Sequence, residues 1–497
     1  MQSVGDHGLN EDVWTVILAF TQLDDARNLS LVSRGIHPIA RRIVLSSAEF
    51  SKQNQFVNAC TFMLDDPGHR ACWLRKLDIN VGALGRHSWQ TAGAASLATQ
   101  LAALLEAARN IDTLSLPSME DLVSAEPRVG ATLISLTRLQ DIALFGVSSR
   151  TLDVANKMVS RPSQVCLAFV SPRASVSEHA FLLSHLALLE RARRAEIMFL
   201  DAADSTDELK QPSDLDVELP QLGQHPCVRE LSLKWCGPFP MFHIFPNTQI
   251  LRMRRLNASF GRFDWRTWAW TESVPLIDVK TDDDDKLVCL TAGGPRLPVL
   301  RRLHLRWNPC PSPQSPSDRM QPVCLSFMLY RADVPLYGQV AHWLEPLRRH
   351  TAPSGRLRYL TISARCLPRL DMPSLWVEWL LPAIRESQLV CVKLKFDVGN
   401  RPREVAGLDE VREMLAWQVP SLRYISIAAG WHRLEHPFAR DDCEPRLIGE
   451  CTWWEVREVG GGRRAELISC AAGQRVERYL QSAEFEEKLS LDGFVLT

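Results

Sequence analysis

The strongest constraint on the fold of this chain is a spacing of apolar residues that returns along most of its length. The spacing is L-x-x-L-x-L, whose last two apolar positions alternate as in a short strand with one buried face. It first occurs at Leu74, Leu77 and Ile79. The further copies are Ile111/Leu114/Leu116, Leu139/Ile142/Leu144, Val228/Leu231/Leu233, Leu300/Leu303/Leu305, Leu357/Leu360/Ile362, Leu389/Val392/Leu394 and Leu422/Ile425/Ile427. Weaker copies lie in 164–169, 194–199 and 325–327, so a long series of short strands is predicted.

Apolar stripes at helical spacing precede several of these strands. One stripe, formed by Leu97, Leu101, Leu104, Leu105 and Ala108, ends just before the strand at 111. Similar stripes over 182–189, 375–384 and 408–415 precede later strands. The strands follow one another at intervals of commonly about 25 to 37 residues, the length of repeats that contain one strand and one helix. This order predicts parallel strands with helices on one flank, in a curved solenoid.

The repeat pattern resembles an irregular leucine-rich-repeat domain. That family places a buried Asn or Cys three residues after the last repeat leucine, and here only Cys236 and Asn308 occupy this position. Without a ladder of such side chains to satisfy backbone groups, we expect the turns to differ between units and the array to be uneven. The alternative is a layered domain built on a parallel sheet. Both possibilities belong to the α/β class.

The N-terminal segment 8–45 begins with a helix that is apolar on two sides. We predict this helix over 11–21, because Asn10 suits the N-cap and acidic Glu11 and Asp12 suit the first turn. One face carries Val13, Val16, Ile17 and Phe20, and a second row carries Trp14 and Leu18. A unit of about forty residues has too little volume to bury both rows. We therefore expect a partner protein to cover one of them.

Two more helices complete this segment. The second is predicted over 23–32, with Asp24 or Asp25 near its cap. Gly35 suits the end of the second helix, and Pro38 suits the first turn of a third. The third helix is expected to turn three apolar residues inward: Ile39, Ile43 and Val44.

The order and spacing of these residues, from Leu9 through Ile17-Leu18 to Arg34, resemble an F-box. F-box domains are three-helix modules that dock on the Skp adaptor of a cullin-RING ubiquitin ligase, and the resemblance implies that role here. Asn10 departs from the proline that usually follows the first leucine. By resemblance, the adaptor-facing residues are Leu9, Val13, Ile17, Leu18, Leu29, Val32 and Arg34. The alternative is an ordinary three-helix cap on the larger domain.

The remaining boundaries follow from composition. Residues 46–70 are predicted as a connector with one amphipathic helix, 71–430 as the leucine-rich-repeat-like solenoid, and 431–497 as a C-terminal cap. The cap is predicted as a hairpin with a glycine turn at 460–462 and a closing helix over 476–485 that covers the open end of the array. Acidic, charged or proline-rich stretches at 201–221, 281–286 and 308–322 are predicted as surface loops, and the Trp-rich stretch 260–270 as packing between repeats.

Composition excludes several functional classes. The 497 residues carry a formal net charge of -1, which leaves no basic field to attract nucleic acid. No apolar run is long enough to cross a bilayer, so no membrane association is expected. The 13 cysteines form no C-x-x-C pair and no secretory signal precedes them, which indicates free thiols in the reducing cytoplasm or nucleus.

One catalytic pattern occurs in the sequence. His432 to His436 fits the H-x-x-E-H form of a zinc peptidase, whose histidines must lie one helical turn apart. Pro437 follows directly and favours a loop over a helix. No phosphate loop and no G-x-S-x-G turn occurs. We therefore predict no metal, no cofactor and no catalytic residue.

These features together predict a non-catalytic substrate-recognition subunit of a Skp-cullin-F-box ubiquitin ligase. The N-terminal helices would bind the Skp adaptor and, through it, the cullin-RING ligase. The solenoid would bind a target protein, whose identity and whose binding residues the sequence does not specify. The alternative is a non-catalytic repeat scaffold or regulatory interaction protein without a ligase role.

Overall fold

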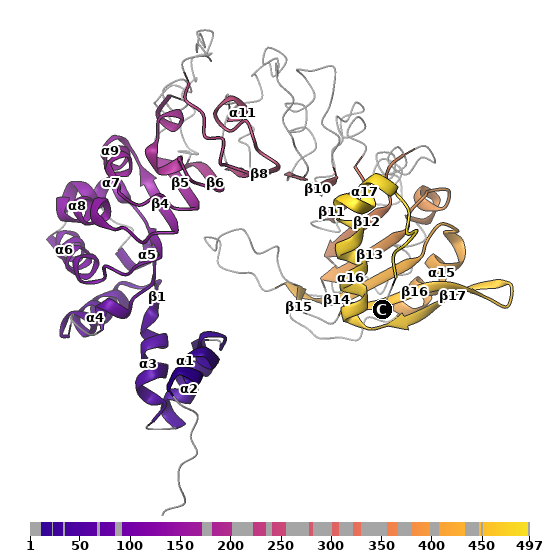
Figure 1. The fold of residues 1–497 in the computed structure, drawn as a ribbon, viewed down its shortest axis with the longest axis horizontal. Helices are drawn as coiled ribbons and strands as arrows, with labels where there is room; N and C mark the ends of the chain where they lie inside the picture. The colour runs from indigo at the N-terminus through magenta and orange to yellow at the C-terminus, as the bar shows by residue number, and fades with distance from the viewer. Residues whose placement is uncertain are drawn as a thin grey trace, which may run out of the picture. The chain divides into compact units, whose positions relative to one another are not determined.

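The structure is a computed structural model of the chain (Figure 1). It describes residues 11–21, 23–32, 35–66, 70–84, 92–170, 181–200, 222–234, 241–254, 278–281, 301–307, 322–329, 355–365, 380–397, 407–432, 447–448 and 451–495. The described elements are mixed α/β, as the sequence predicts. The chain separates into two compact units, Met1–Pro246 and Asn247–Thr497, at a boundary within the range that the sequence predicts as one array.

The first unit opens with three helices at the positions that the sequence predicts. These are α1 (Glu11–Ala19), α2 (Leu23–Val32) and α3 (His37–Ser46), the last with Pro38 in its first turn. Strand β1 (Ser47–Phe50) follows α3 directly and was not expected from the sequence. The connector helix is α4 (Gln53–Leu64), which buries Phe56, Cys60 and Met63 as its apolar stripe predicts.

Parallel strands form the sheet of the first unit. After η1 (Ala71–Trp73) these are β2 (Lys76–Ile79), β3 (Thr113–Leu116), β4 (Asp141–Val147), β5 (Gln164–Val170), β6 (Arg194–Leu200) and β7 (Glu230–Lys234). Strand β1 pairs with β2, and each strand to β7 pairs in parallel with the next. The predicted strands of this unit, including the weaker copies at 164 and 194, are therefore confirmed. Their repeat leucines, such as Leu77 and Leu114, are fully buried.

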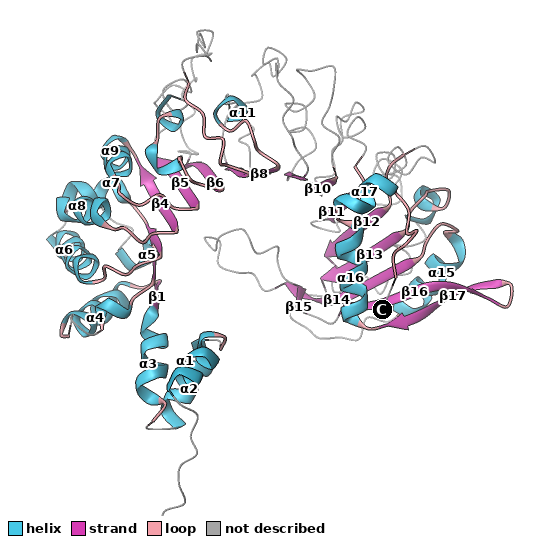
Figure 2. Ribbon diagram, in the orientation of Figure 1, coloured by secondary structure: helices cyan, strands magenta, loops and turns pink. Residues whose placement is uncertain are grey.

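Helices lie along one side of this sheet (Figure 2). They are α5 (Val81–Leu84), α6 (Ala92–Ala107), α7 (Met119–Ala125), α8 (Pro127–Ser135), α9 (Ser149–Lys157), η2 (Ala187–Leu189) and α11 (Met241–Ile244). Helix α6 carries the predicted stripe, and its Leu97, Leu101, Leu104 and Leu105 are buried. Because strand side chains alternate between faces, the repeat leucines point to one face of the sheet and the residues between them to the other.

A regular chain of backbone hydrogen bonds runs along the edge where the strands begin. The carbonyl of Arg75 accepts from the N–H groups of Asp112 at 2.7 Å and Thr113 at 2.9 Å. The carbonyls of Asp112, Gln140, Ser163 and Arg193 each accept in the same way from two consecutive N–H groups of the next repeat. Main-chain groups thus satisfy one another at this edge, whereas the turns expected to differ between units follow the opposite ends of the strands.

A bulge interrupts the other end of β4. The pairing of β4 with β5 shifts between Phe145 and Val147, and Gly146 between them has φ +73°. A Cβ on Gly146 would lie 2.9 Å from the Cα of Ser118. Glycine is required here because both the left-handed backbone and the close approach exclude a side chain.

The second unit contains a parallel sheet of the same kind. Strands β8 (Ile250–Arg254), β9 (Asp278–Thr281), β10 (Arg302–Trp307), β11 (Cys324–Leu329), β12 (Tyr359–Arg365), β13 (Cys391–Asp397) and β14 (Tyr424–His432) pair in that order. Helix α15 (Leu408–Gln418) precedes β14 and buries Val411 and Leu415, as predicted. Strands β8 and β9 were not expected from the sequence. The predicted stretches at 201–221, 260–270, 282–286 and 308–321 lie outside the described residues.

A hairpin ends this sheet. Strand β16 (Cys451–Val459) pairs antiparallel with β14, and β17 (Gly462–Ile468) pairs antiparallel with β16. Gly460 and Gly461 have positive φ in the turn, so the predicted hairpin with its glycine turn is confirmed. A short strand, β15 (Leu447–Ile448), pairs with the end of β14.

The C-terminal helices differ from the prediction of one helix over 476–485. There are two, α16 (Cys470–Leu480) and α17 (Ala483–Lys488), with N-caps from the hydroxyls of Ser469 and Ser482. The hairpin occupies the end of the sheet, whereas α16 lies across the sheet face (Figure 1). Helix α16 lies on this face because it buries a row of apolar side chains there.

Candidate adaptor-binding helix and sheet faces

Helix α1 buries one of its two apolar rows and exposes the other. Leu18 is fully buried, and Trp14 packs against the same core. That core consists of Leu18, Ala26, Ile39 and Ala40, with Trp14, Leu29, Ile36, Ile43 and Val44 packed around it. On the other face the exposed fractions are 40% for Val13, 59% for Val16, 38% for Ile17 and 87% for Phe20. We refer to these four residues as the exposed row of α1.

The predicted adaptor-facing residues divide between these two environments. Val13 and Ile17 lie in the exposed row, so the structure brings them together on one surface. Leu18 has no exposed surface and Leu29 packs against the core, so both support the helices from inside. Leu9 and Arg34 lie outside the described residues, as does the side chain of Val32. Val16 and Phe20 were not among the site residues, although their spacing from Val13 indicates the same face.

Aromatic and guanidinium groups connect the three helices to the rest of the first unit. The guanidinium of Arg70 lies 4.2 Å from the ring centroid of Phe62 on α4, and that of Arg41 on α3 lies 5.8 Å from the same ring. Arg42 on α3 lies 5.6 Å from the ring of Trp73. Such contacts are worth about 0.5 to 1 kcal/mol each at exposed sites. Since α3 also continues directly into β1, the helices are joined to the sheet at two places.

The sheet face opposite the repeat leucines is polar at the first position of each strand in the first unit. The residues that pair across the strands at this position are Lys76, Thr113, Asp141, Gln164, Arg194 and Glu230. All of them are exposed or half-buried. Further along the strands, small and apolar residues gather around Ala143, Cys166, Ala168 and Met198. A buried ion pair of 2.6 Å joins Lys234 to Glu196 beside them.

The equivalent face of the second unit is apolar at the first position of strands β11 to β14, and α16 and α17 cover it there. Its aligned residues Cys324, Tyr359, Cys391 and Tyr424 are all buried. They form a core with Val323, Trp453, Val476, Leu480 and Phe485. The absence of a side chain at Gly473 lets α16 pack directly on Trp453, because a Cβ at Gly473 would lie 2.1 Å from the ring of Trp453. This part of the face is therefore closed to a partner.

Polar contacts fix the two helices on this face. Glu477 accepts hydrogen bonds from the Tyr359 hydroxyl at 2.6 Å and from Lys393 Nζ at 2.7 and 2.8 Å. Glu486 pairs with Arg301 at 2.8 Å and with Arg356 at 3.4 Å. Charges that are mostly buried are thus paired, as buried charges must be.

Burial holds the polar groups of this core in their neutral forms. It raises the pKa of the Cys324 thiol to about 12 and that of the Cys391 thiol well above its usual value. Burial and the carboxylate of Glu477 raise the pKa of Tyr359 well above its usual value, and burial raises that of Tyr424 to about 12. Thiols of this kind are poor nucleophiles, because the thiolate is the reactive form.

The first histidine of the zinc-peptidase pattern lies in a strand and not in a helix. His432 is the last residue of strand β14, and His436 lies outside the described residues. Among the residues that the structure describes, no group of three His, Cys, Asp or Glu side chains is arranged to hold a metal ion. Within the same part of the chain, no helix has both the length and the apolar character needed to cross a membrane.

No protein-family model matches this chain, and no curated protein matches it. The functional assignment therefore depends on the residues themselves. The features available for binding are the exposed row of α1 and the polar sheet face of the first unit.

Proposed function

We propose that this chain is the substrate-recognition subunit of a Skp-cullin-F-box ubiquitin ligase. In this proposal α1 to α3 form an F-box-like module that docks on the Skp adaptor. The strands and helices after them form a leucine-rich-repeat-like solenoid that binds a target protein. The chain contributes no chemical group to ubiquitin transfer. It raises the effective concentration of the target near an activated ubiquitin that another subunit carries.

The exposed row of α1 is the observation that carries the proposal. Val13, Val16, Ile17 and Phe20 leave a continuous apolar stripe uncovered on a helix whose other face is already buried. Complete burial of a fully exposed side chain of this kind contributes roughly 1.5 to 3 kcal/mol, and covering the exposed 38 to 87% of each side chain in the row contributes a corresponding part of that. A partner that covers the row therefore gains enough free energy for a specific complex. The F-box resemblance names the Skp adaptor as that partner.

The difference in burial between the two sheet faces indicates which surface a target protein would contact. In the second unit, α16 and α17 already cover the face over Cys324, Tyr359, Cys391 and Tyr424. The polar row of the first unit, from Lys76 to Glu230, carries charges of both signs and is exposed or half-buried. We therefore assign target binding to this polar row of the first unit.

The test is a pull-down of the purified Skp adaptor by the full-length chain. Ile17→Asp and Phe20→Asp each place a charge in the exposed row, and both should abolish binding while circular dichroism shows an unchanged fold. The matched control is Val459→Asp, because Val459 is 53% exposed on the hairpin of the second unit. This variant should bind like the unmodified chain.

Retention of the adaptor by Ile17→Asp would contradict the proposed docking surface. If the unmodified chain does not bind the adaptor at all, the ligase role is wrong. The repeat scaffold without a ligase role is then the better assignment, with the three helices acting as an N-terminal cap.

A further inference from the structure

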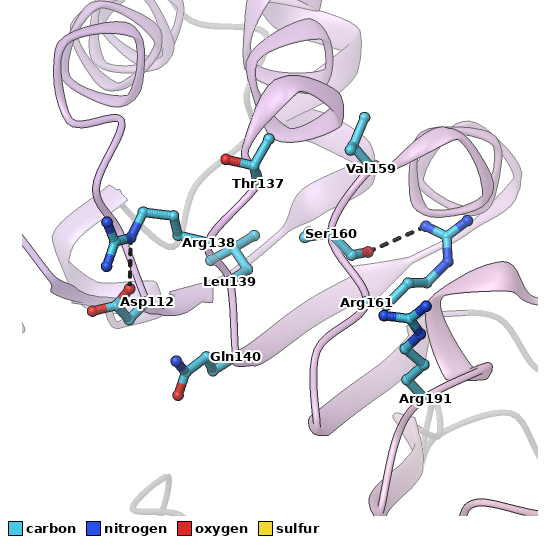
Figure 3. Close-up of a pocket in the computed structure, with 9 residues that line it drawn as sticks. All are labelled: Asp112, Thr137, Arg138, Leu139, Gln140, Val159, Ser160, Arg161 and Arg191. Carbon is cyan, nitrogen blue, oxygen red and sulfur yellow. Dashed lines mark hydrogen bonds and ion pairs between the residues drawn. The ribbon is translucent and has the colours of Figure 1, made fainter.

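A pocket of about 410 Å³ lies at the edge of the first unit where strands β4, β5 and β6 begin (Figure 3). The loops that enter these strands each place one arginine in it: Arg138, Arg161 and Arg191. The remaining polar groups in the lining include Asp112, Gln140 and Ser160. The regular chain of backbone hydrogen bonds described above holds these loops in register, so the pocket has a defined frame.

The three guanidinium groups differ in how far they are paired. Arg138 turns toward Asp112, with 3.6 Å between Nε and the carboxylate (Figure 3). Arg161 is held by Glu190 at 3.0 Å and by the carbonyls of Met158 and Ser160. Arg191 makes no hydrogen bond or ion pair with any other residue that the structure describes. The pocket therefore retains a net positive charge after its internal pairs are counted.

Ser160 provides a second and independent indication of a ligand. It is 3% exposed, and its hydroxyl oxygen has no hydrogen-bond partner among the described residues. A buried hydroxyl without a partner is unfavourable by about 1 to 3 kcal/mol, so such groups are rare unless something else satisfies them. Ser160 lines the pocket, but its hydroxyl oxygen has almost no accessible surface in the structure without a ligand, so a rotation about the Cα–Cβ bond is needed to turn it toward a bound acceptor oxygen.

We infer that this pocket binds an oxyanion of the phosphate class, through Arg191, Arg161 and the Ser160 hydroxyl. A guanidinium group presents a planar pair of donors that matches two oxygens of a phosphate, and a hydroxyl donates to a third. An anionic ligand can pair with the exposed guanidinium of Arg191 without displacing an internal partner. The volume lies within the range of small-molecule sites and exceeds that of a phosphate ion alone, so a phosphate ester also fits.

This inference is independent of the ligase role, because neither α1 nor the adaptor takes part. The probes are inorganic phosphate and O-phosphoserine, each titrated into the full-length chain at low ionic strength and followed by calorimetry and by phosphorus NMR. Serine serves as the uncharged comparison for O-phosphoserine. Tighter binding of O-phosphoserine indicates an ester ligand, and tighter binding of inorganic phosphate indicates a free ion. Both outcomes support the site.

Arg191→Gln and Ser160→Ala should each weaken binding of the tighter probe by about tenfold, the loss expected for one charge-assisted hydrogen bond. Arg475→Gln is the matched control, since Arg475 is an exposed arginine of the second unit and lies outside the pocket. It removes the same charge and should leave the affinity unchanged.

Thermal unfolding separates a ligand site from a structural role. Without phosphate, Ser160→Ala should unfold at the same temperature as the unmodified chain or higher, because it removes an unpaired hydroxyl. At a given phosphate concentration, the unmodified chain and Arg475→Gln should gain equal stability, and Arg191→Gln and Ser160→Ala should gain less. Absence of saturable binding of either probe, or an equal loss of affinity in Arg475→Gln, would overturn the inference.

Discussion

The two units contain the same kind of parallel sheet, but the sheet faces opposite the repeat leucines differ in polarity and in burial. At the first position of each strand the first unit places Lys76, Thr113, Asp141, Gln164, Arg194 and Glu230. At the same position the second unit places Asp278, Arg302, Cys324, Tyr359, Cys391 and Tyr424. The first row is polar and accessible, whereas the last four residues of the second row are buried under α16.

This difference shows that the repeat leucines determine the frame and the residues between them determine the surface. Both sheets bury their leucines in the same way. An apolar row on the opposite face cannot remain in water without loss of stability, and the C-terminal helices of the same chain cover it. A polar row needs no such cover. The first unit therefore leaves a polar row exposed on the face that the second unit uses to hold itself together.

The largest effect that follows from this comparison is on stability. Tyr359→Ala removes a buried aromatic ring and should lower the free energy of unfolding of the second unit by about 3 to 5 kcal/mol. Gln164→Ala changes the corresponding exposed position of the first unit and should change it by less than about 0.5 kcal/mol. Urea unfolding followed by tryptophan fluorescence and circular dichroism measures both. Equal effects of the two variants would mean that the faces do not differ as described.

A somewhat smaller effect is expected for the charge that fixes α16. Glu477→Gln leaves the ammonium of Lys393, 9% exposed, without its carboxylate. Removing one partner of a fully buried pair costs about 3 to 5 kcal/mol, and the partial exposure of Glu477 reduces this to about 2 to 3 kcal/mol. The control is Glu484→Gln on α17, whose pair with Lys488 is exposed and should matter by less than about 0.5 kcal/mol.

A double-mutant cycle separates the ion pair from the packing. If Lys393→Met is combined with Glu477→Gln, the loss should be smaller than the sum of the two single losses, because no unpaired charge remains. Additive losses would show that Glu477 acts on Tyr359 alone and not on Lys393.

The strands were predictable from sequence because their signal is local. Leu77 and Ile79 alternate with polar residues in one strand, as Leu114 and Leu116 do in the next, and all four side chains are buried in the structure. Strands β1, β8 and β9 were missed because each has a small or polar residue at one apolar position of the spacing: Ala48, Thr248 and Thr281 respectively. The exposed row of α1 was also predictable from local sequence, because its four residues lie on one face of a single helix.

The position of α16 was not predictable because it depends on residues far apart in the chain. Its amphipathic pattern indicates a helix, but what it covers is set by Cys324, Tyr359 and Cys391, which lie far earlier in the sequence. The pocket at the strand edge has the same character. Arg138, Arg161 and Arg191 each precede a strand, and only the register of the sheet brings them to one place.

A moderate effect is expected where α16 approaches the sheet most closely. Gly473→Ala places a methyl group 2.1 Å from the ring of Trp453, and should lower the stability of the second unit by about 2 kcal/mol through overpacking. Gly462→Ala is the matched control, because its nearest new contact is Trp417 at 3.5 Å, an ordinary van der Waals distance. If Gly473→Ala unfolds at the same urea concentration as the control, α16 does not pack on Trp453.

The smallest effect per residue is expected from alkaline pH, and it should differ between the units. In the second unit, burial raises the pKa values of two thiols and two phenols: Cys324, Cys391, Tyr359 and Tyr424. In the first unit, burial raises the pKa of Cys60 to about 12. Above pH 9 the unfolded chain releases thiol protons that the folded chain retains, so stability falls as pH rises. Each such thiol contributes a loss of about 1.4 kcal/mol over the pH unit above its unfolded pKa.

Cysteine labelling resolves this loss by unit. Pulses of iodoacetamide in increasing urea, read by mass spectrometry at pH 8 and pH 10, give an unfolding midpoint for Cys60 in the first unit and for Cys324 in the second. The midpoint at Cys324 should fall further than that at Cys60 between the two pH values. Cys391→Ala removes one titrating thiol, so it should reduce the fall at Cys324 and leave Cys60 unchanged. Equal falls at both cysteines would contradict the assignment, because among the described residues the second unit has four thiol and phenol groups with raised pKa values beneath α16, and the first unit has the one at Cys60.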